Sequence, residues 1–136
     1  MPFLTTDRKS SRGFSLIEIL IVVAIVGILA TIAVPSYQSA VRKSNRGAAE
    51  SYLSDIAQRQ QQFLLDQRSY AATEAALGLT APSSVAPYYK ITITPAAGPP
   101  PGFTASAQPL GSQTGDLAGQ SLTIDNTGAK GPTGAW

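Results

Sequence analysis

The sequence contains no cysteine and no histidine among its 136 residues. Disulfide bonds, thiolate nucleophiles and the commonest zinc ligands are therefore excluded. No serine or other nucleophile can be activated by a histidine, and no glycine-rich loop stands between a predicted strand and a predicted helix to bind a phosphate. The sequence accordingly predicts no cofactor, no metal and no enzyme active site.

Charged residues are also scarce, at 13% of the chain. Residues 1–13 carry three of the ten basic residues and one of the eight acidic residues, which leaves seven of each sign in residues 14–136. A segment with no net charge has no global field to attract nucleic acid or anionic lipid. Binding to either must therefore depend on local clusters of charge.

The longest apolar run is residues 14–34, FSLIEILIVVAIVGILATIAV, in which Glu18 is the single charge. A helix of these 21 residues spans about 31 Å, close to the roughly 30 Å hydrocarbon core of a bilayer. The apolar region of a cleaved secretory signal is shorter, about 7–15 residues, and is followed by a small-residue cleavage site. No such site follows this run, so we predict a membrane-spanning helix.

Glu18 is the anomaly within this helix. An acidic residue there costs on the order of 1–3 kcal/mol, depending on its depth in the bilayer. Nothing in its own helix can pair with it, so we expect a partner from another molecule. Basic residues flank the run on both sides, and counting them does not settle the orientation in the membrane.

The segment RGFSLIEILIVV, with Gly13, Phe14 and Glu18 at fixed offsets, closely resembles the leader and N-terminus of type IV pilins and of their pseudopilin relatives. The resemblance implies that a membrane peptidase cuts after Gly13, removes residues 1–13 as a leader peptide and N-methylates Phe14. It also implies that the Glu18 carboxylate meets the terminal amine of a neighbouring subunit during assembly. That contact would supply the missing partner.

Gly27 and Pro35 also match the family, and both weaken a helix. Glycine destabilises a helix by up to about 1 kcal/mol, and proline removes one hydrogen bond of the helix. The segment between them could unwind when filaments pack or stretch. A plain kink, or a helix that restarts at Pro35, is the alternative interpretation.

Residues 36–66 keep a helical repeat but become amphipathic. With the first run they predict one helix of about fifty residues, roughly 75 Å long. The apolar stripe should pack against a sheet, and it consists of Tyr37, Val41, Ala48, Tyr52, Ile56 and Phe63, with Ala40, Ala49, Leu53 and Gln60 beside them.

Three basic residues, Arg42, Lys43 and Arg46, form a local cluster just beyond the apolar run. They could contact DNA or lipid headgroups. We favour a solvated or subunit-contacting helix face directly above the membrane. Lys130 is a further candidate for contact with DNA or a partner.

The remainder of the chain predicts a small antiparallel sheet. Alternating patterns predict strands at 88–94, 103–108 and 121–125, and PAAGPPPG (95–102) reads as a hairpin connection that cannot continue a strand. A short helix is expected at 72–77, ended by Gly78. Asp116 and Asp125 could hold calcium with loop carbonyls, but a role in forming turns is the better interpretation.

The tail SLTIDNTGAKGPTGAW resembles the end of a PilE-like subgroup of minor pilins. Members of that subgroup usually carry two cysteines in this region, and Gly119 and Ala135 stand in their places. A disulfide closing a loop of about 15 residues would contribute about 3 kcal/mol in the chain-entropy model. We expect Trp136 to replace it in part by packing back on the sheet.

The predicted fold is α+β: a long N-terminal helix packed on an antiparallel sheet of three or four strands, as in pilins. The predicted segments are the leader (1–13), the transmembrane and polymerisation helix (14–34) and an extracytoplasmic head (35–136) that includes the amphipathic half of the helix (35–66). The resemblance implies a structural subunit of a type IV pilus, which supports adhesion, twitching motility or DNA uptake. A type II secretion pseudopilin and a DNA-binding competence pilin are the alternatives.

The resemblance also implies a set of partners and a location. The partners are other copies of the chain and other pilins, the prepilin peptidase and methyltransferase, the assembly machinery of the inner membrane, and the lipid bilayer before assembly. DNA is a further partner under the competence alternative. The precursor is expected to cross the inner membrane once with its N-terminus in the cytoplasm, and the mature chain is expected in a pilus on the cell surface.

Overall fold

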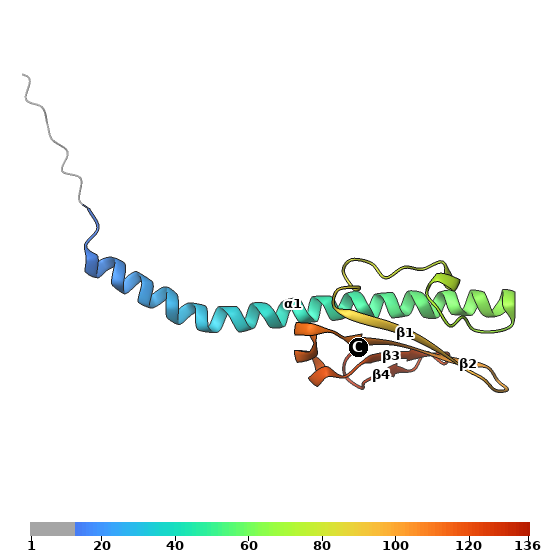
Figure 1. Cartoon of the computed structure of the whole chain (residues 1–136). Coiled ribbons are helices and arrows are strands. Elements are labelled where there is room, and N and C mark those ends of the chain that lie inside the picture. Colours follow the sequence, from blue (N-terminus) through green and yellow to red (C-terminus); the bar gives the residue numbers. More distant parts are fainter. Residues whose placement is uncertain (1–12) are drawn as a thin grey trace, which may run out of the picture. The chain divides into compact units, whose positions relative to one another are not determined.

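The computed structural model describes residues 13–136, so most of the predicted leader lies outside the described residues. The chain divides into two compact units, one ending at Tyr37 and the other comprising Gln38–Trp136. A single α-helix, α1 (Leu16–Gln67), begins in the first unit and continues into the second (Figure 1). Its 52 residues confirm the predicted long helix.

In the first unit, α1 has no cover on any side. Every residue from Gly13 to Gln38 is exposed, including the large apolar side chains of Phe14, Ile17 and Leu29. The most apolar 18-residue window of α1 has a mean hydropathy of 2.9 and no buried residue. The helix is therefore long and apolar enough to cross a membrane.

Gly27 and Pro35 do not interrupt the helix. α1 continues through both residues, so a helix restart at Pro35 does not occur in this structure. The ring nitrogen of Pro35 has no hydrogen to donate to the carbonyl of Thr31, four residues earlier. The Thr31 hydroxyl instead donates to the Ile28 carbonyl at 2.7 Å. This stretch consequently holds fewer main-chain hydrogen bonds than its neighbours.

The second unit contains a four-stranded antiparallel sheet in the order β1-β2-β3-β4. Its strands are β1 (Tyr89–Ala96), β2 (Gly102–Pro109), β3 (Leu122–Asp125) and β4 (Lys130–Gly131). The first three were predicted. The fourth was missed because two residues are too short to show any alternation of apolar and polar side chains.

The prediction that residues 95–102 cannot continue a strand is wrong at both ends of that segment. Pro95 and Ala96 belong to β1, and Gly102 opens β2. Pro95 pairs with Phe103, whose carbonyl accepts from Asn126 on the other side of β2. This is a pair without mutual hydrogen bonds, so the nitrogen of Pro95 faces the open edge of β1, where a missing donor is tolerated.

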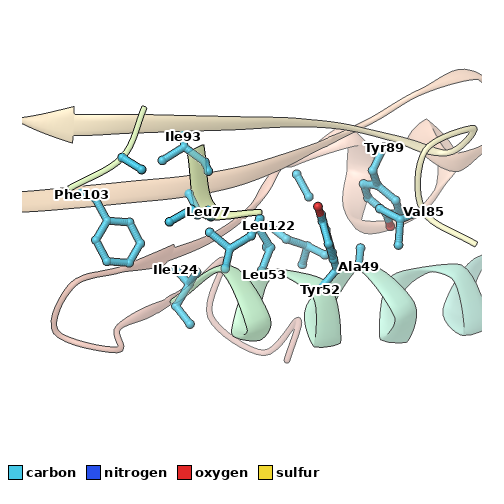
Figure 2. Close-up of a cluster of buried hydrophobic side chains, with 14 of the residues drawn as sticks. Ala49, Tyr52, Leu53, Leu77, Val85, Tyr89, Ile93, Phe103, Leu122 and Ile124 are labelled. Atoms are coloured by element: carbon cyan, nitrogen blue, oxygen red, sulfur yellow. The ribbon is translucent and has the colours of Figure 1, made fainter. Parts of the chain in front are cut away.

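One apolar core joins the sheet to the second half of α1 (Figure 2). Alternate residues of β2 and β3 point inward, in keeping with the alternating patterns that predicted these strands; they are Phe103, Ala105, Ala107, Leu122 and Ile124. From α1 the core takes Ala49, Tyr52, Leu53, Ile56 and Gln60.

Tyr37 and Val41 were expected in the same stripe, but they remain 73% and 38% exposed. In the second unit the buried part of the stripe begins at Ala49, later than the periodicity indicates.

The segment between α1 and β1 is mainly turns. The helix expected at 72–77 is a single 3₁₀ turn, η1 (Ala75–Leu77), which Gly78 ends in the left-handed conformation as predicted. Two further 3₁₀ turns, η2 (Gly111–Gly115) and η3 (Leu117–Gly119), occupy the loop between β2 and β3. This loop returns to the helix and contacts the basic cluster there.

Candidate functional site

The residues around the predicted cleavage point form the open start of α1. The Ser15 carbonyl accepts from the main-chain N–H groups of Glu18 and Ile19 at 3.1 and 3.2 Å, which begins the helix. Gly13, Phe14, Ser15 and Glu18 line a hollow of about 430 Å³. A Cβ at Gly13 would meet no atom within 4 Å, so the backbone there is accessible.

Glu18 lies in the first turn of α1, where the helix dipole favours a negative charge. The dipole contributes only about 0.3–1 kcal/mol at an exposed site, less than is needed to bury an ionised carboxylate in hydrocarbon. Within residues 13–136 both salt bridges lie in the head, and neither involves Glu18. A cation from outside this part of the chain can therefore still pair with it.

The basic cluster does not form one surface. Arg46 donates from Nη1 to both carboxylate oxygens of Asp116 at 3.2 Å, and its Nε lies 3.5 Å from Glu50 Oε1. The side chain of Arg42 is half-buried, and its carbonyl accepts from the side chain of Gln113. Lys43 alone is exposed. Arg46 thus holds the β2–β3 loop on the helix.

Burial raises the pKa of Glu50, although the neighbouring Arg46 acts in the opposite direction. Glu50 Oε1 is buried without a hydrogen-bond partner in the described part of the chain. The ion pair with Arg46 therefore compensates only part of the loss of water around this carboxylate.

The two aspartates considered as calcium ligands have different roles. Asp116 pairs with Arg46, whereas Asp125 forms the predicted turn: its Oδ1 accepts from the N–H groups of Thr127 and Ala129 and from the Thr127 hydroxyl. The bond from the Thr127 hydroxyl is the main cause of the lowered pKa of Asp125. Among residues 13–136, no three acidic side chains gather as metal ligands would.

The C-terminal tail packs back as predicted. The indole nitrogen of Trp136 donates to the Gly131 carbonyl at 2.9 Å, and the Lys130 ammonium lies 4.4 Å from the centre of its ring. Ala135 is buried in the core. Lys130 therefore contacts an aromatic ring of its own chain, although Lys130 is exposed to solvent.

Two buried glutamines position the loops and were not predicted in this role. Gln113 Nε2 donates to the Arg42 carbonyl and the Tyr89 hydroxyl at 2.8 and 2.9 Å, and its Oε1 accepts from Asn45. Gln60 pairs with the main chain of Ala71. For Gln60 the sequence does carry a signal of burial, because this glutamine lies within the apolar stripe. Gln113 lies in an irregular loop, where no periodicity marks burial.

Comparison with known proteins gives two family matches that meet end to end. Residues 8–34 match the prokaryotic N-terminal methylation motif. Residues 35–123 match the family described as "Type IV minor pilin ComP, DNA uptake sequence receptor". The chain belongs to the type IV pilin family. It is a structural pilin, and its apolar N-terminal helix and motif are those of membrane-anchored subunits that assemble into pili.

Individual relatives agree. The fimbrial protein EcpC of Eikenella corrodens is 32% identical over 91% of this pilin and 80% of its own length. The type IV wide pilus major component PilA4 of Thermus thermophilus is 38% identical over 51% of this pilin, and the aligned part is about half (53%) of PilA4. The type II secretion system core protein G of Dickeya chrysanthemi is 32% identical over 52% of this pilin and 46% of its own length.

The fold is also that of a solved pilin. A type IV pilin structure from Shewanella oneidensis matches 70% of this chain and 97% of its own, with a TM-score of 0.56 and 30% sequence identity. The long helix packed on a four-stranded antiparallel sheet is therefore a pilin fold, as predicted from the sequence.

Proposed function

We propose that this pilin is cut between Gly13 and Phe14, N-methylated on Phe14, and polymerised through the apolar half of α1. The observation that carries the proposal is that this half of the helix is exposed on all sides and lies within residues 8–34, which match the methylation motif. At about 25 cal/mol per Å² of apolar surface, water strongly disfavours such a helix. A bilayer before assembly, and helices of other copies after it, would remove that surface from water.

Glu18 gives the assembly a specific contact. Cutting after Gly13 would create a terminal amine on Phe14, beside the carboxylate of Glu18 in the same hollow. In a second copy the same amine is the cation that Glu18 lacks. Away from water the Coulomb attraction between the two charges is stronger than at a surface, and leaving either charge unpaired there is costly, so the contact would select copies that present both groups.

These steps give the proposed order of membrane insertion, processing and assembly. The precursor crosses the inner membrane once, with its N-terminus in the cytoplasm, where the prepilin peptidase and methyltransferase act on it. The assembly machinery then moves the mature chain into a filament on the cell surface. Its role is structural rather than enzymatic, and the Gly13–Phe14 bond is the substrate of another protein.

Processing is tested by Gly13→Val in the bacterium that carries the gene. A branched side chain at this position should block cleavage, so the uncut precursor should remain in the membrane and be absent from the filaments. Gly98→Val is the control, because Gly98 is also exposed with no atom near its Cβ position. Mass spectrometry of wild-type filaments should show residues 14–136 with one added methyl group. Normal incorporation of the uncut variant would refute the proposal.

The assembly role of Glu18 is tested by Glu18→Gln, which keeps size and removes charge. We expect processing to continue and filament yield to fall, because the terminal amine of the neighbour loses its counter-ion. Glu74→Gln, a change of the same type in the head, should leave the yield unchanged.

Deletion of the gene should then be scored for twitching and for protein secretion, which separates a pilus from a secretion pseudopilus.

A second function, DNA binding, is favoured by the match of residues 35–123 to a family described as a DNA uptake sequence receptor. The exposed cations available in the described part of the chain are Lys43, Arg59, Arg68, Lys90 and Lys130. Arg46 is occupied by Asp116 and should contribute little.

DNA binding is tested by titrating the pilin in detergent with duplex DNA at two salt concentrations. A phosphate-contacting surface must lose affinity as salt rises. We expect Lys130→Ala to weaken binding and to reduce its salt dependence. An affinity that does not respond to salt would remove this function.

A further inference from the structure

β1 is an edge strand of the sheet, and one of its two sides faces away from β2. The hydrogen bonds with β2 show which residues face outward. The Tyr88 carbonyl accepts from the Leu110 N–H at 2.8 Å, directly beyond the paired residues of the two strands. In an antiparallel pair every second residue forms the mutual hydrogen bonds. The even-numbered residues of β1 therefore bond to β2, whereas the main-chain groups of Ile91 and Ile93 face away from it.

The outward main-chain groups of Ile91 and Ile93 are open. In the described part of the chain, no main-chain hydrogen bond beyond the β1–β2 ladder involves either residue. The open stretch has a limit at each end: the Tyr89 N–H donates to the Val85 carbonyl at 2.9 Å, and Pro95 has no N–H to offer. Two N–H groups and two carbonyls between these limits form a template for pairing with another extended segment.

A groove of about 220 Å³ lies at this open stretch. One wall is β1 and the other is the segment between α1 and β1, and the lining residues are Ile91, Thr92, Ile93, Ala72, Thr73 and Glu74. Ala72 and Thr73 are exposed and small, which leaves space beside the strand edge. The groove thus combines free main-chain groups on one wall with a carboxylate on the other.

Glu74 supplies the charge of the groove. Its Oε1 accepts from the Tyr52 hydroxyl at 2.6 Å, and Tyr52 is buried in the core, so the carboxylate is tied to α1. Glu74 itself is half-buried and takes part in neither salt bridge of residues 13–136. The groove therefore presents a fixed negative charge that no salt bridge of this part of the chain compensates.

We propose that this groove binds an extended, basic peptide segment of a partner protein as a fifth strand of the sheet. The main chain of the segment hydrogen-bonds to Ile91 and Ile93, which gives affinity with little regard to sequence. Residues that pair directly across two strands point to the same face of a sheet. Ile93 lies in the core between the sheet and α1 (Figure 2), so its partner residue also points to the helix side. A lysine or arginine there reaches Glu74, which selects for basic segments.

A second copy of this chain fits the groove less well. The longer of its two edge strands is β1, and antiparallel pairing of two β1 edges brings Ile91 and Ile93 of both copies to the helix side. Lys90 lies on the opposite face of β1, because successive side chains alternate. Neither Glu74 carboxylate then meets a cation. The charge of the groove consequently favours a basic segment of another protein.

Peptide titration tests the proposal on the full chain in detergent. The probe is fluorescently labelled acetyl-Thr-Val-Thr-Lys-Thr-Val-Thr-amide, in which lysine and the two valines share one face of a strand. We expect saturable binding by fluorescence polarisation. Methylation of the main-chain nitrogens of lysine and valine removes the donors that face β1 and should weaken binding about tenfold or more. Methylation of the two threonines that flank lysine is the control. No saturable binding, or equal affinity of the two methylated peptides, would overturn strand addition.

Two substitutions separate the main-chain contact from the charge. Ile91→Pro removes the open donor without breaking a bond to β2, as at Pro95, and should abolish binding. Ile91→Ala keeps the donor and is the matched control. Glu74→Gln keeps an acceptor for Tyr52 and should weaken binding about fivefold, the upper end for exposed ion pairs. Binding by Ile91→Pro as tight as by Ile91→Ala would contradict pairing with β1. Unchanged binding by Glu74→Gln would contradict selection of a basic segment.

Hydrogen exchange identifies the occupant of the edge. The amides of Ile91 and Ile93 should exchange freely in the detergent-solubilised chain and slow when the peptide is added. Slow exchange of both amides in filaments without peptide would show that a second copy fills the edge, which would overturn the choice of partner. The proposal does not depend on cleavage or polymerisation, and Glu74→Gln should leave filament yield unchanged. Intact filaments that bind no peptide would therefore refute the groove alone.

Discussion

The side chain of Gln60 pairs with both main-chain groups of Ala71: Nε2 donates to the carbonyl at 2.8 Å and Oε1 accepts from the N–H at 2.9 Å. Gln60 is fully buried and Ala71 is 3% exposed. The side-chain amide of Gln60 thus makes the two main-chain hydrogen bonds that a neighbouring strand would make with Ala71, a residue of the loop that follows α1. This contact fixes where the loop begins its return across the helix.

Gln60→Ala is expected to destabilise the head by about 2–4 kcal/mol, because it leaves a buried donor and a buried acceptor without partners. Thermal unfolding of the detergent-solubilised chain, followed by circular dichroism at a wavelength sensitive to the sheet, measures the change. Gln62→Ala, on the exposed side of the same helix, should stay within about 0.5 kcal/mol of wild type. Equal effects of the two substitutions would show that the Ala71 contact is unimportant.

Asp116→Asn should loosen the β2–β3 loop from the helix. The Arg46–Asp116 pair is 19% and 14% exposed, so water screens it only in part, and its loss should destabilise the head by about 1–3 kcal/mol. Hydrogen exchange should increase first in residues 110–119. Asp55→Asn is the control, because Asp55 is exposed and takes part in neither salt bridge of residues 13–136. Unchanged exchange in the loop would contradict the proposed function of this ion pair.

The raised pKa of Glu50 predicts a pH dependence of folding. Because the folded pKa lies above the ordinary value of 4.5, the folded state binds the proton more tightly than the unfolded state. The resulting stabilisation is complete below 4.5 and is lost as pH rises through the folded pKa. The free energy of unfolding should therefore fall with rising pH just above 4.5.

Glu50→Gln should flatten this part of the stability profile, because a neutral amide cannot titrate. Chemical denaturation at several pH values measures the slope. Asp125, whose pKa is lowered, acts in the opposite sense: its contribution is present above 3.8 and is lost as pH falls below that value. A Glu50→Gln profile with the wild-type slope above pH 4.5 would assign that titration to another group.

Trp136→Phe removes the indole donor to Gly131 and weakens the contact with Lys130, but it keeps an aromatic ring in place. We expect a loss of about 1–2 kcal/mol in the free energy of unfolding. Thermal unfolding by circular dichroism is the suitable measurement, since Trp136 is the only tryptophan. Tyr37→Phe, at an exposed aromatic residue, should have little effect. No change for Trp136→Phe would indicate that the tail does not stabilise the sheet.

The long-range features of the fold follow from repeated patterns and could be predicted. An apolar run followed by a stripe with helical spacing predicts α1. The strict alternation of inward residues predicts β2 and β3. The error at Pro95 had a non-local cause: whether a proline fits a strand depends on which edge of the sheet its nitrogen faces. That property belongs to the pairing of β1 with β2, and no single strand reveals it.

The exposed residues of the stripe have a similar explanation. Tyr37 and Val41 have the correct helical spacing, but spacing shows only which side of a helix is apolar. It does not show how far along the helix the covering sheet extends. In the second unit that limit is set by β1, β2 and the β2–β3 loop, whose pairing and turns decide which part of α1 they reach.

The order of residues alone determined the apolar helix, its lone carboxylate at Glu18, the motif around Gly13 and Phe14, and three of the four strands. These features arise between near neighbours in the chain, where hydrophobic periodicity and motif spacing act directly. Only the tertiary structure decided that Arg46 is neutralised by Asp116 and that Gln60 and Gln113 hold the loops. It also decided that Asp55 and Arg59 remain exposed. Those outcomes depend on which distant groups meet after packing, because burial and pairing are properties of a surface formed by several elements together.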